Sequence, residues 1–376
     1  MIDFETEQLN HLCKAMNPHA DFDAQFTFYY DETNNIKKFK MNNGEFNAPF
    51  SSNFVLGGLA FEGPRPDVSR LFEGVYLQAN TQDIKLKHLA FGDFEACLKS
   101  PKLTPFLAYL VKSPLYLHFS SINILYFSVV DIVDSAIANS RVARQAGYGF
   151  DNLLKNCLYK LCRLEIAAVK ALFHRYEYPN VKPGRIGNFI EDLTALFEDY
   201  LDEPEYHLGL SSLKQILKES KKAGSLPFIM DETDHVLIGG LAEFYKRPVY
   251  TFRYATHIFD NEAEIQTEVK KYQFTYRGKP INNYTFSDSK NDLLTQGSDV
   301  IVGFVGKLSK FFNTHTAHEI KGIVGKMNAV QLTNLDLYLD LVMKSEQRNP
   351  AFFHYSDSRD DHAKNELLFQ LRGKIR

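Results

Sequence analysis

Three acidic sites stand where a hydrophobic segment of the sequence stops or turns polar. Asp31 and Glu32 end the alternating run QFTFYYDE, and Asp231 ends the run PFIMD. Asp299 stands inside an otherwise apolar segment with helical spacing, where a carboxylate without a partner costs stability. Hard cations such as Mg²⁺ and Mn²⁺ prefer oxygen ligands that converge from several elements. The pattern therefore predicts a divalent metal site with Asp31, Asp231 and Asp299 as ligands.

Ordinary structural roles also explain these carboxylates. An Asp at a strand end is commonly a turn or N-cap residue. Asp299 shares a polar or small helix face with Asp292, Gln296 and Gly303, so it would face solvent or pair with a lysine. The spacing alone does not choose between these roles and metal binding, because short patterns of this kind often arise by chance.

Alternating and apolar runs predict the strands that position Asp31. The run QFTFYYDE at 25–32 alternates, which is typical of a strand. Its two faces are Phe26, Phe28 and Tyr30 on one side and Thr27, Tyr29 and Asp31 on the other. Turn residues at 33–35 lead to a second predicted strand at 36–41, and a third strand at 53–61 is apolar on both faces. These three strands form a predicted β-meander.

Helical spacing predicts helices for most of the remaining chain. The predicted helices span 4–16, 66–79, 91–111, 122–138, 151–176, 185–201, 208–222, 260–273, 291–312 and 317–344. Further strands are predicted at 115–119, 227–231 and 284–286. The chain beyond residue 349 is predicted to be a polar, mixed tail with an apolar patch at Leu367, Leu368 and Phe369.

The run of helices in the middle of the chain predicts its organisation. We expect an α/β core in two parts, 1–121 and 225–312, interrupted by a helical insertion at 122–224 and followed by a helical C-terminal extension at 313–376. The apolar stripes of the insertion exceed what one α/β core needs to cover, which predicts a homodimer through this segment.

Composition and charge exclude several classes of protein. The 376 residues are 44% hydrophobic, which excludes global disorder, and 43 Lys+Arg against 46 Asp+Glu leave no overall positive field. A nucleic-acid site must then be a local patch. The sequence has no nucleotide-binding glycine loop, no serine-hydrolase motif, no C-x-x-C pair and no apolar run of about 20 residues. We expect a cytoplasmic protein with reduced thiols.

Three segments resemble one protein family. They are YYDETNN at 29–35, PFIMDETDH at 227–235 and FSDSKNDLLTQGSDVIVGFVGKL at 286–308. Together they are similar in order and spacing to the family of domain of unknown function 3800. The last segment is the most specific, with Asp288, Gln296, Asp299 and Gly303 at matching positions. The resemblance covers most of 25–310.

The resemblance implies a fold similar to ribonuclease H and the retroviral integrases, with a mixed sheet flanked by helices. It also implies a metal-dependent nuclease that uses Mg²⁺ or Mn²⁺, with Asp31, Asp231 and Asp299 as catalytic metal ligands and Glu32 and Asp288 as secondary ones. Two departures from the family pattern stand out at the sequence level. Gly297 replaces an apolar residue, and KLKHLAF at 85–91 lacks the glutamate of a Glu-Leu-Lys element. The fourth carboxylate is then unassigned, with Glu95 as one guess.

Two metal ions about 3.5–4 Å apart would give such a site its chemistry, by activating a water and stabilising the departing 3′-oxygen. Lys87, Lys290 and Lys307 would neutralise neighbouring phosphates of an RNA or DNA substrate. The alternative is a catalytically degenerate module that binds nucleic acid or a protein partner. For the nuclease, the resemblance implies a setting in bacterial defence or mobile elements.

Overall fold

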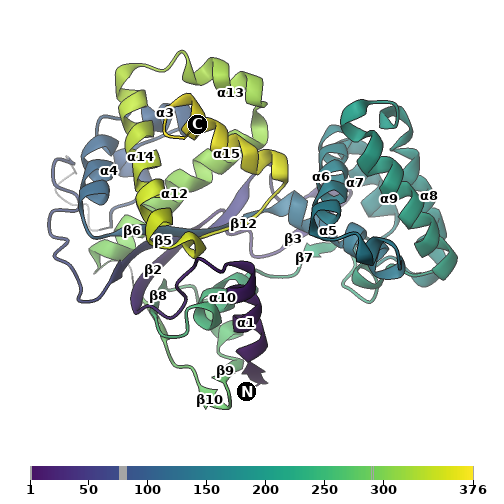
Figure 1. Ribbon diagram of the computed structural model, residues 1–376, viewed down its shortest axis with the longest axis horizontal. Helices are drawn as coiled ribbons and strands as arrows, with labels where there is room; N and C mark the ends of the chain where they lie inside the picture. The colour runs from purple at the N-terminus through teal and green to yellow at the C-terminus, as the bar shows by residue number, and fades with distance from the viewer. Residues whose placement is uncertain (1, 76–82, 289, 291, 376) are drawn as a thin grey trace.

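The computed structural model describes residues 2–75, 83–288, 290 and 292–375. Its centre is a six-stranded mixed sheet with the strand order β11-β8-β2-β5-β6-β12 (Figure 1). The strands are β2 (Phe26–Thr33), β5 (Asn53–Glu62), β6 (Tyr116–Asn123), β8 (Thr256–Asp260), β11 (Tyr284–Ser287) and β12 (Phe353–Ser356). The prediction of an α/β protein with a mixed sheet flanked by helices is confirmed.

The register of the sheet brings three strand ends to one edge. β2 pairs antiparallel with β5, and β5 pairs antiparallel with β6. On its other side β2 pairs parallel with β8, and β8 pairs parallel with β11. Since parallel strands point the same way, the carboxyl ends of β2, β8 and β11 lie next to one another.

Helices cover both faces of this sheet. One face packs against α12 (Leu293–Thr314) and α14 (Ala329–Arg348), and the other packs against α10 (Ala242–Thr251), which also holds α1 (Glu7–Met16) (Figure 1). Tyr29 lies in the core on the α12 side, whereas Phe28 and Tyr30 lie in the core on the opposite side. The predicted alternation of β2 is confirmed, and it turns Asp31 toward α12.

Two small sheets lie outside the central one. The first joins β1 (Ile2–Glu5), β9 (Tyr272–Tyr276) and β10 (Lys279–Pro280), and the second joins β3 (Phe39–Asn42), β4 (Glu45–Phe46) and β7 (Val236–Ile238). The predicted meander is therefore wrong in its middle strand, because β2 pairs directly with β5 while β3 pairs with β4 and β7. Positive φ angles at Asn34, Lys37 and Asn43 turn this connection away from the sheet.

A lobe of helices stands beside the sheet (Figure 1). It contains α5 (Ile124–Asn139), α6 (Tyr148–Leu164), α7 (Ile166–Arg175), α8 (Ile186–Ala195) and α9 (Pro204–Ala223). α5 follows β6 directly, and the side chain of Asn123 caps it by accepting a hydrogen bond from the Tyr126 N–H at 3.0 Å. The preference for a helix at 122–138 is confirmed, whereas the long helix predicted at 151–176 is interrupted at Glu165.

Several predicted elements differ from the structure. Residues 66–75 form turns and irregular chain instead of a helix, and 76–79 lie outside the described residues. The helix predicted at 91–111 is two helices, α3 (Phe94–Leu98) and α4 (Leu103–Lys112), because Pro101 lies between them and cannot donate a backbone hydrogen bond. The helix predicted at 260–273 is reduced to α11 (Ala263–Val269) by the strands on either side. The strand predicted at 227–231 is a single 3₁₀ turn, η4 (Pro227–Ile229).

The chain after α12 forms regular elements up to Leu371. After α13 (Ala317–Val324) and α14 come η6 (Pro350–Phe352), then β12, then α15 (Arg359–Leu371). β12 pairs parallel with β6 at the edge of the central sheet, and α15 buries Leu368 and Phe369. The prediction of a polar tail beyond residue 349 is wrong, because this segment completes both the sheet and its helical cover.

Candidate active site

Asp31 is a buried carboxylate with an unsatisfied oxygen. Its side chain is only 6% exposed, and Oδ1 accepts a hydrogen bond from the Glu32 N–H at 2.7 Å. Oδ2 is buried and has no hydrogen-bond partner among the described residues. Burial, followed by the negative charges of Asp299, Glu32 and Asp260, raises the pKa of Asp31 to about 9. Such a group is stabilised by a cation.

Asp260 is the carboxylate that sequence reasoning missed. It ends β8, and the preceding Phe259 pairs with Tyr30, so the end of β8 lies beside the end of β2. The sequence pattern predicts Asp260 at the start of the charged helix at 260–273. The available signal was the run THIFD, which alternates and ends in Asp as the run before Asp31 does.

Glu32 belongs to the same group of carboxylates. Burial is the largest of the effects that raise its pKa, and the charges of Glu262 and Asp260 act in the same direction. The Asn35 side chain donates a hydrogen bond to Glu32 Oε1 at 3.4 Å and opposes this shift. Glu32 therefore lies at the edge where β2 and β8 end, but it pairs with Leu56 and its side chain leaves β2 on the face opposite to Asp31.

α12 brings Asp299 to this edge. Asp299 Oδ2 forms a salt bridge with Lys85 Nζ at 3.1 Å, and Oδ1 accepts a hydrogen bond from the Leu86 N–H at 3.2 Å. Burial lowers the pKa of Lys85, but the charges of Asp299, Asp83 and Asp31 raise it overall. The expected pairing of Asp299 with a lysine is thus present, and the same carboxylate still acts on Asp31.

Small residues let α12 approach the sheet closely. The Leu59 N–H donates to Ser298 Oγ at 3.1 Å. A Cβ at Gly297 would lie 2.8 Å from Leu59 Cδ1, and a Cβ at Gly306 would lie 2.6 Å from Thr33 Cγ2. A side chain at position 297 would therefore require Leu59 and Leu71 to shift, which gives Gly297 a packing role between α12 and the sheet.

A surface cleft of ≈ 280 Å³ lies beside this group, and neither Asp31 nor Asp260 is among the residues that line it. Glu32 and Asp299 line it together with Lys87, Lys307 and the exposed ring of Phe91. Two of the three lysines predicted to meet phosphates thus lie beside the carboxylates. Neither Lys87 nor Lys307 forms a salt bridge within the described part of the chain.

The structure places the other predicted site residues differently. Asp231 is exposed, has a φ of 61° and follows η4, which packs on α5 of the helical lobe. It is not brought together with Asp31 and Asp299, because the segment expected to carry it to the sheet edge is not a strand. Glu95 lies on α3 and is not among the carboxylates that act on Asp31.

Asp288 and Lys290 follow β11 near the same sheet edge. The preceding Ser287 pairs with Asp260, so Asp288 begins the loop two strands away from Asp31. Asp288 is exposed, and its Oδ1 accepts a hydrogen bond from the Lys290 N–H at 3.1 Å. These two residues flank the carboxylate group and do not line its cleft.

Carboxylate oxygens are suitable ligands for a hard cation, but in this structure they are not positioned around a common point. The charges of Asp299, Glu32 and Asp260 act on Asp31, the ammonium group of Lys85 pairs with Asp299 and Asp83, and one buried oxygen of Asp31 has no partner among the described residues. Across 2–75, 83–288, 290 and 292–375, no group of three or more His, Cys, Asp or Glu side chains stands ready to hold a metal ion. The carboxylates would have to move together to bind one.

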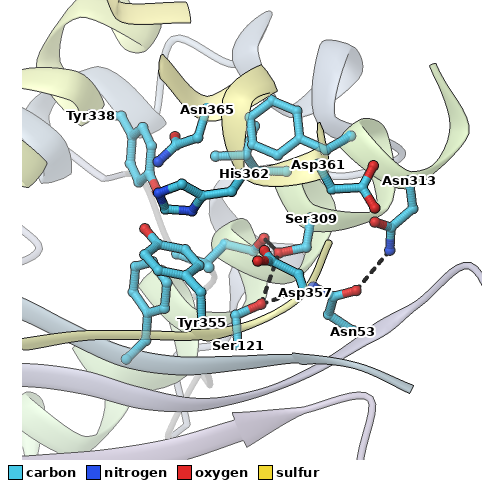
Figure 2. A pocket seen from close by; sticks show the side chains of 14 residues that line it. Asn53, Ser121, Ser309, Asn313, Tyr338, Tyr355, Asp357, Asp361, His362 and Asn365 are labelled. Carbon is cyan, nitrogen blue, oxygen red and sulfur yellow. Dashed lines mark hydrogen bonds between the residues drawn. The ribbon is translucent and has the colours of Figure 1, made fainter. Parts of the chain in front are cut away.

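A second buried acidic group lies apart from this cleft, between α12, α15 and β6 (Figure 2). Its cavity of ≈ 20 Å³ has room for one water molecule. Asp357 lies in it beside Ser121 and Ser309, and burial raises the pKa of Asp357 to about 8. The neighbouring Asp361 is paired with Lys364 at 2.7 Å. The small volume leaves no space for an organic substrate.

Comparison of the chain with protein-family models, curated proteins and solved structures gives no match. No helix in the described part of the chain is both long and apolar enough to cross a membrane.

Proposed function

We propose that the protein is a divalent-metal-dependent nuclease of the cytoplasm, with a ribonuclease H-like core, acting in bacterial defence or on mobile elements. The observation that carries the proposal is Asp31, a buried carboxylate with a partnerless oxygen beside other carboxylates and a lysine-lined cleft. The sheet supports the core assignment. An antiparallel unit β2-β5-β6 is extended beside β2 by two parallel strands, β8 and β11, which makes the sheet mixed as the resemblance implies.

The residues divide into two roles. Asp31, Asp260 and Asp299 would hold Mg²⁺ or Mn²⁺, which supplies an activated water and stabilises charge at the phosphate, while the charge of Glu32 acts on Asp31 from the other face of β2. Lys87 and Lys307 bind the phosphates on either side of the scissile one, because they are the cations of the cleft without a carboxylate partner in the described chain. Asp260 takes the place that Asp231 holds in the sequence-based prediction.

Cleavage of labelled oligonucleotides tests this function. Single-stranded RNA, double-stranded DNA and an RNA–DNA hybrid are each incubated with Mg²⁺, Mn²⁺ or EDTA. We expect cutting that needs the metal and is lost in both Asp31→Asn and Asp260→Asn, while Asp231→Asn cuts like the wild type. Cutting that persists in Asp31→Asn, or is lost only in Asp231→Asn, would contradict the assignment.

One observation favours a second function. The ammonium of Lys85 already pairs with Asp299, and the segment at 85–91 lacks the glutamate of the Glu-Leu-Lys element that the resemblance implies. A non-catalytic module that binds nucleic acid or a protein would keep this ion pair and need no metal. A rise in melting temperature with Mn²⁺ that disappears in Asp299→Ala would exclude this reading, because ligand binding to the folded state raises its stability.

A further inference from the structure

Phe91 is exposed without a structural reason in the fold. Its side chain is 83% exposed, the highest value among the large apolar side chains that the structure describes. It lies in the short connection between α2 (Leu86–Leu89) and α3. Leaving an aromatic ring in water forgoes the stabilisation of burial, which is about 25 cal/mol for each Å² of apolar surface. A role outside the core would explain the exposed ring.

The connection holds the ring in place from both sides. Ala90 is buried and its N–H donates to the Leu86 carbonyl at 2.8 Å. Gly92 has a φ of 98°, and Asp93 caps α3 by accepting a hydrogen bond from the Ala96 N–H at 2.8 Å. The ring therefore projects from an anchored loop, which reduces the entropy lost when something packs against it.

The neighbours of the ring match the parts of a nucleotide. Lys87 and Lys307 line the same cleft and offer charge to phosphates, while Asp299 and Glu32 mark the metal-binding side. A flat apolar ring that lines the same cleft would meet a nucleobase next to a phosphate held at the carboxylates. Stacking on an aromatic ring is tolerant of base identity, because every base has a π-face.

We propose that Phe91 is the stacking platform for an unpaired nucleobase next to the phosphate held at the carboxylates. The substrate class is then single-stranded nucleic acid, since the bases of a continuous duplex have both faces covered by their neighbours. The inference rests on the proposed function for the identity of the cleft, and it adds the strandedness of the substrate and the residue that selects it.

The absence of tryptophan from the sequence makes a direct test possible. Phe91→Trp introduces a single fluorophore at the platform, and a second Asp31→Asn substitution prevents cutting during the titration. We expect a 12-nucleotide single strand of dT or rU to quench this fluorescence, and a blunt duplex of equal length to leave it nearly unchanged. The matched control is Met16→Trp, at a side chain 62% exposed on α1, whose fluorescence stays constant in both titrations.

Affinity gives the second measurement. Phe91→Ala should weaken single-strand binding about tenfold, in line with the loss of one stacked base, and leave duplex binding and the melting temperature unchanged. Equal quenching by duplex and single strand, or no loss of affinity in Phe91→Ala, would overturn the proposal. So would fluorescence that depends on protein concentration alone, since it would assign the ring to self-association.

The two proposals fail separately. Quenching by a single strand with no cutting by the wild type would remove the nuclease and keep the platform. Metal-dependent cutting without selective quenching would keep the nuclease and remove the platform.

Discussion

Asp31 lowers the stability of the folded protein. A buried carboxyl group without a partner for one oxygen, surrounded by other acids, costs free energy that an enzyme accepts for binding a cation. Asp31→Asn removes the ionisable group and keeps the shape. In EDTA at neutral pH we expect the melting temperature of this variant to rise by a few degrees, measured by circular dichroism.

The control for this prediction is Asp93→Asn, because Asp93 is an exposed helix cap and Asn caps helices equally well. Its melting temperature should not change. A melting temperature of Asp31→Asn at or below that of the wild type would show that Asp31 has a stabilising partner, and would weaken its assignment as a metal ligand.

Asp357 predicts a pH dependence that is independent of the cleft. Its pKa is raised from 3.8 to about 8 by burial and then by the charge of Asp361. The folded state holds this proton at a pH where the unfolded state has lost it, so the contribution to stability is full below about pH 4 and falls as the pH rises toward 8. Asp357→Asn should abolish that fall.

Urea unfolding at pH 5 and pH 8 measures the effect. We expect the free energy of unfolding of the wild type to fall between pH 5 and pH 8 because of Asp357. In Asp357→Asn this fall should be smaller, by an amount on the order of a few kcal/mol. Asp361→Asn is the contrast, because it removes the ion pair with Lys364 and should destabilise at both pH values. The same pH dependence in Asp357→Asn and wild type would rule out Asp357 as its source.

At the scale of the element, the position of Asp299 depends on how closely α12 packs on the sheet. Gly58 of β5 has a φ of 153°, and a Cβ there would lie 2.4 Å from the Tyr29 carbonyl oxygen and 2.3 Å from Ser298 Oγ. Gly58→Ala should therefore push α12 away and lower the free energy of unfolding by about 1–3 kcal/mol, the usual cost of overpacking.

Urea unfolding checks this, with Gly322→Ala as the control because no atom lies within 4 Å of its added Cβ. Gly322 lies within α13, where alanine is the better helix former, so that variant should be as stable as the wild type or slightly more so. A stable Gly58→Ala would mean that α12 has room to shift, and that Asp299 is not held rigidly.

The elements that the sequence predicted well are those with a long, regular pattern. β2 and β5 follow from alternation and an apolar run, and α9 and α12 follow from the helical spacing at 208–222 and 291–312. The segment at 227–231 is too short for periodicity to distinguish a strand from a turn. It forms a 3₁₀ turn that packs against α5. β12 was missed because an edge strand of four half-buried residues carries almost no pattern.

Local sequence patterns likewise predict some residues of the candidate site and miss others. Asp31 was predictable because its strand ends in acid, and Asp299 because it interrupts an apolar helix. Asp260 and Lys85 were not, because their roles arise from partners far away in sequence: β8 pairs with β2, and Lys85 meets Asp299 across 214 positions. No local pattern contains that information.

At the scale of the whole molecule, the helical lobe exposes three large apolar side chains among the described residues, and Phe228 in the neighbouring η4 is a fourth. Val142 is 76% exposed, and Leu164, Leu208 and Phe228 are 51–64% exposed. We expect the lobe to cover them in a homodimer, so light scattering should give twice the 43.2 kDa of the chain. A mass of one chain at all concentrations would contradict this prediction, and Leu208→Glu should lower the mass of a dimer formed there.

The C-terminal segment after Asn349 packs on the edge of the sheet and on α12, and we expect the protein to need it for folding. β12 pairs with Phe119–Ile122 of β6, α15 buries Leu368, and Lys364 Nζ donates to the Phe312 carbonyl of α12 at 2.7 Å. Removing the segment uncovers the edge of the sheet and part of the core around α12.

A chain ended after Asn349 should lose the cooperative thermal transition. A chain ended after Gly373 should keep it, because it loses little more than the ion pair between Lys374 and Asp340. If both shortened chains melt like the full one, the edge strand and α15 contribute nothing to the stability of the core, and Asp299 is positioned by α12 and the sheet alone.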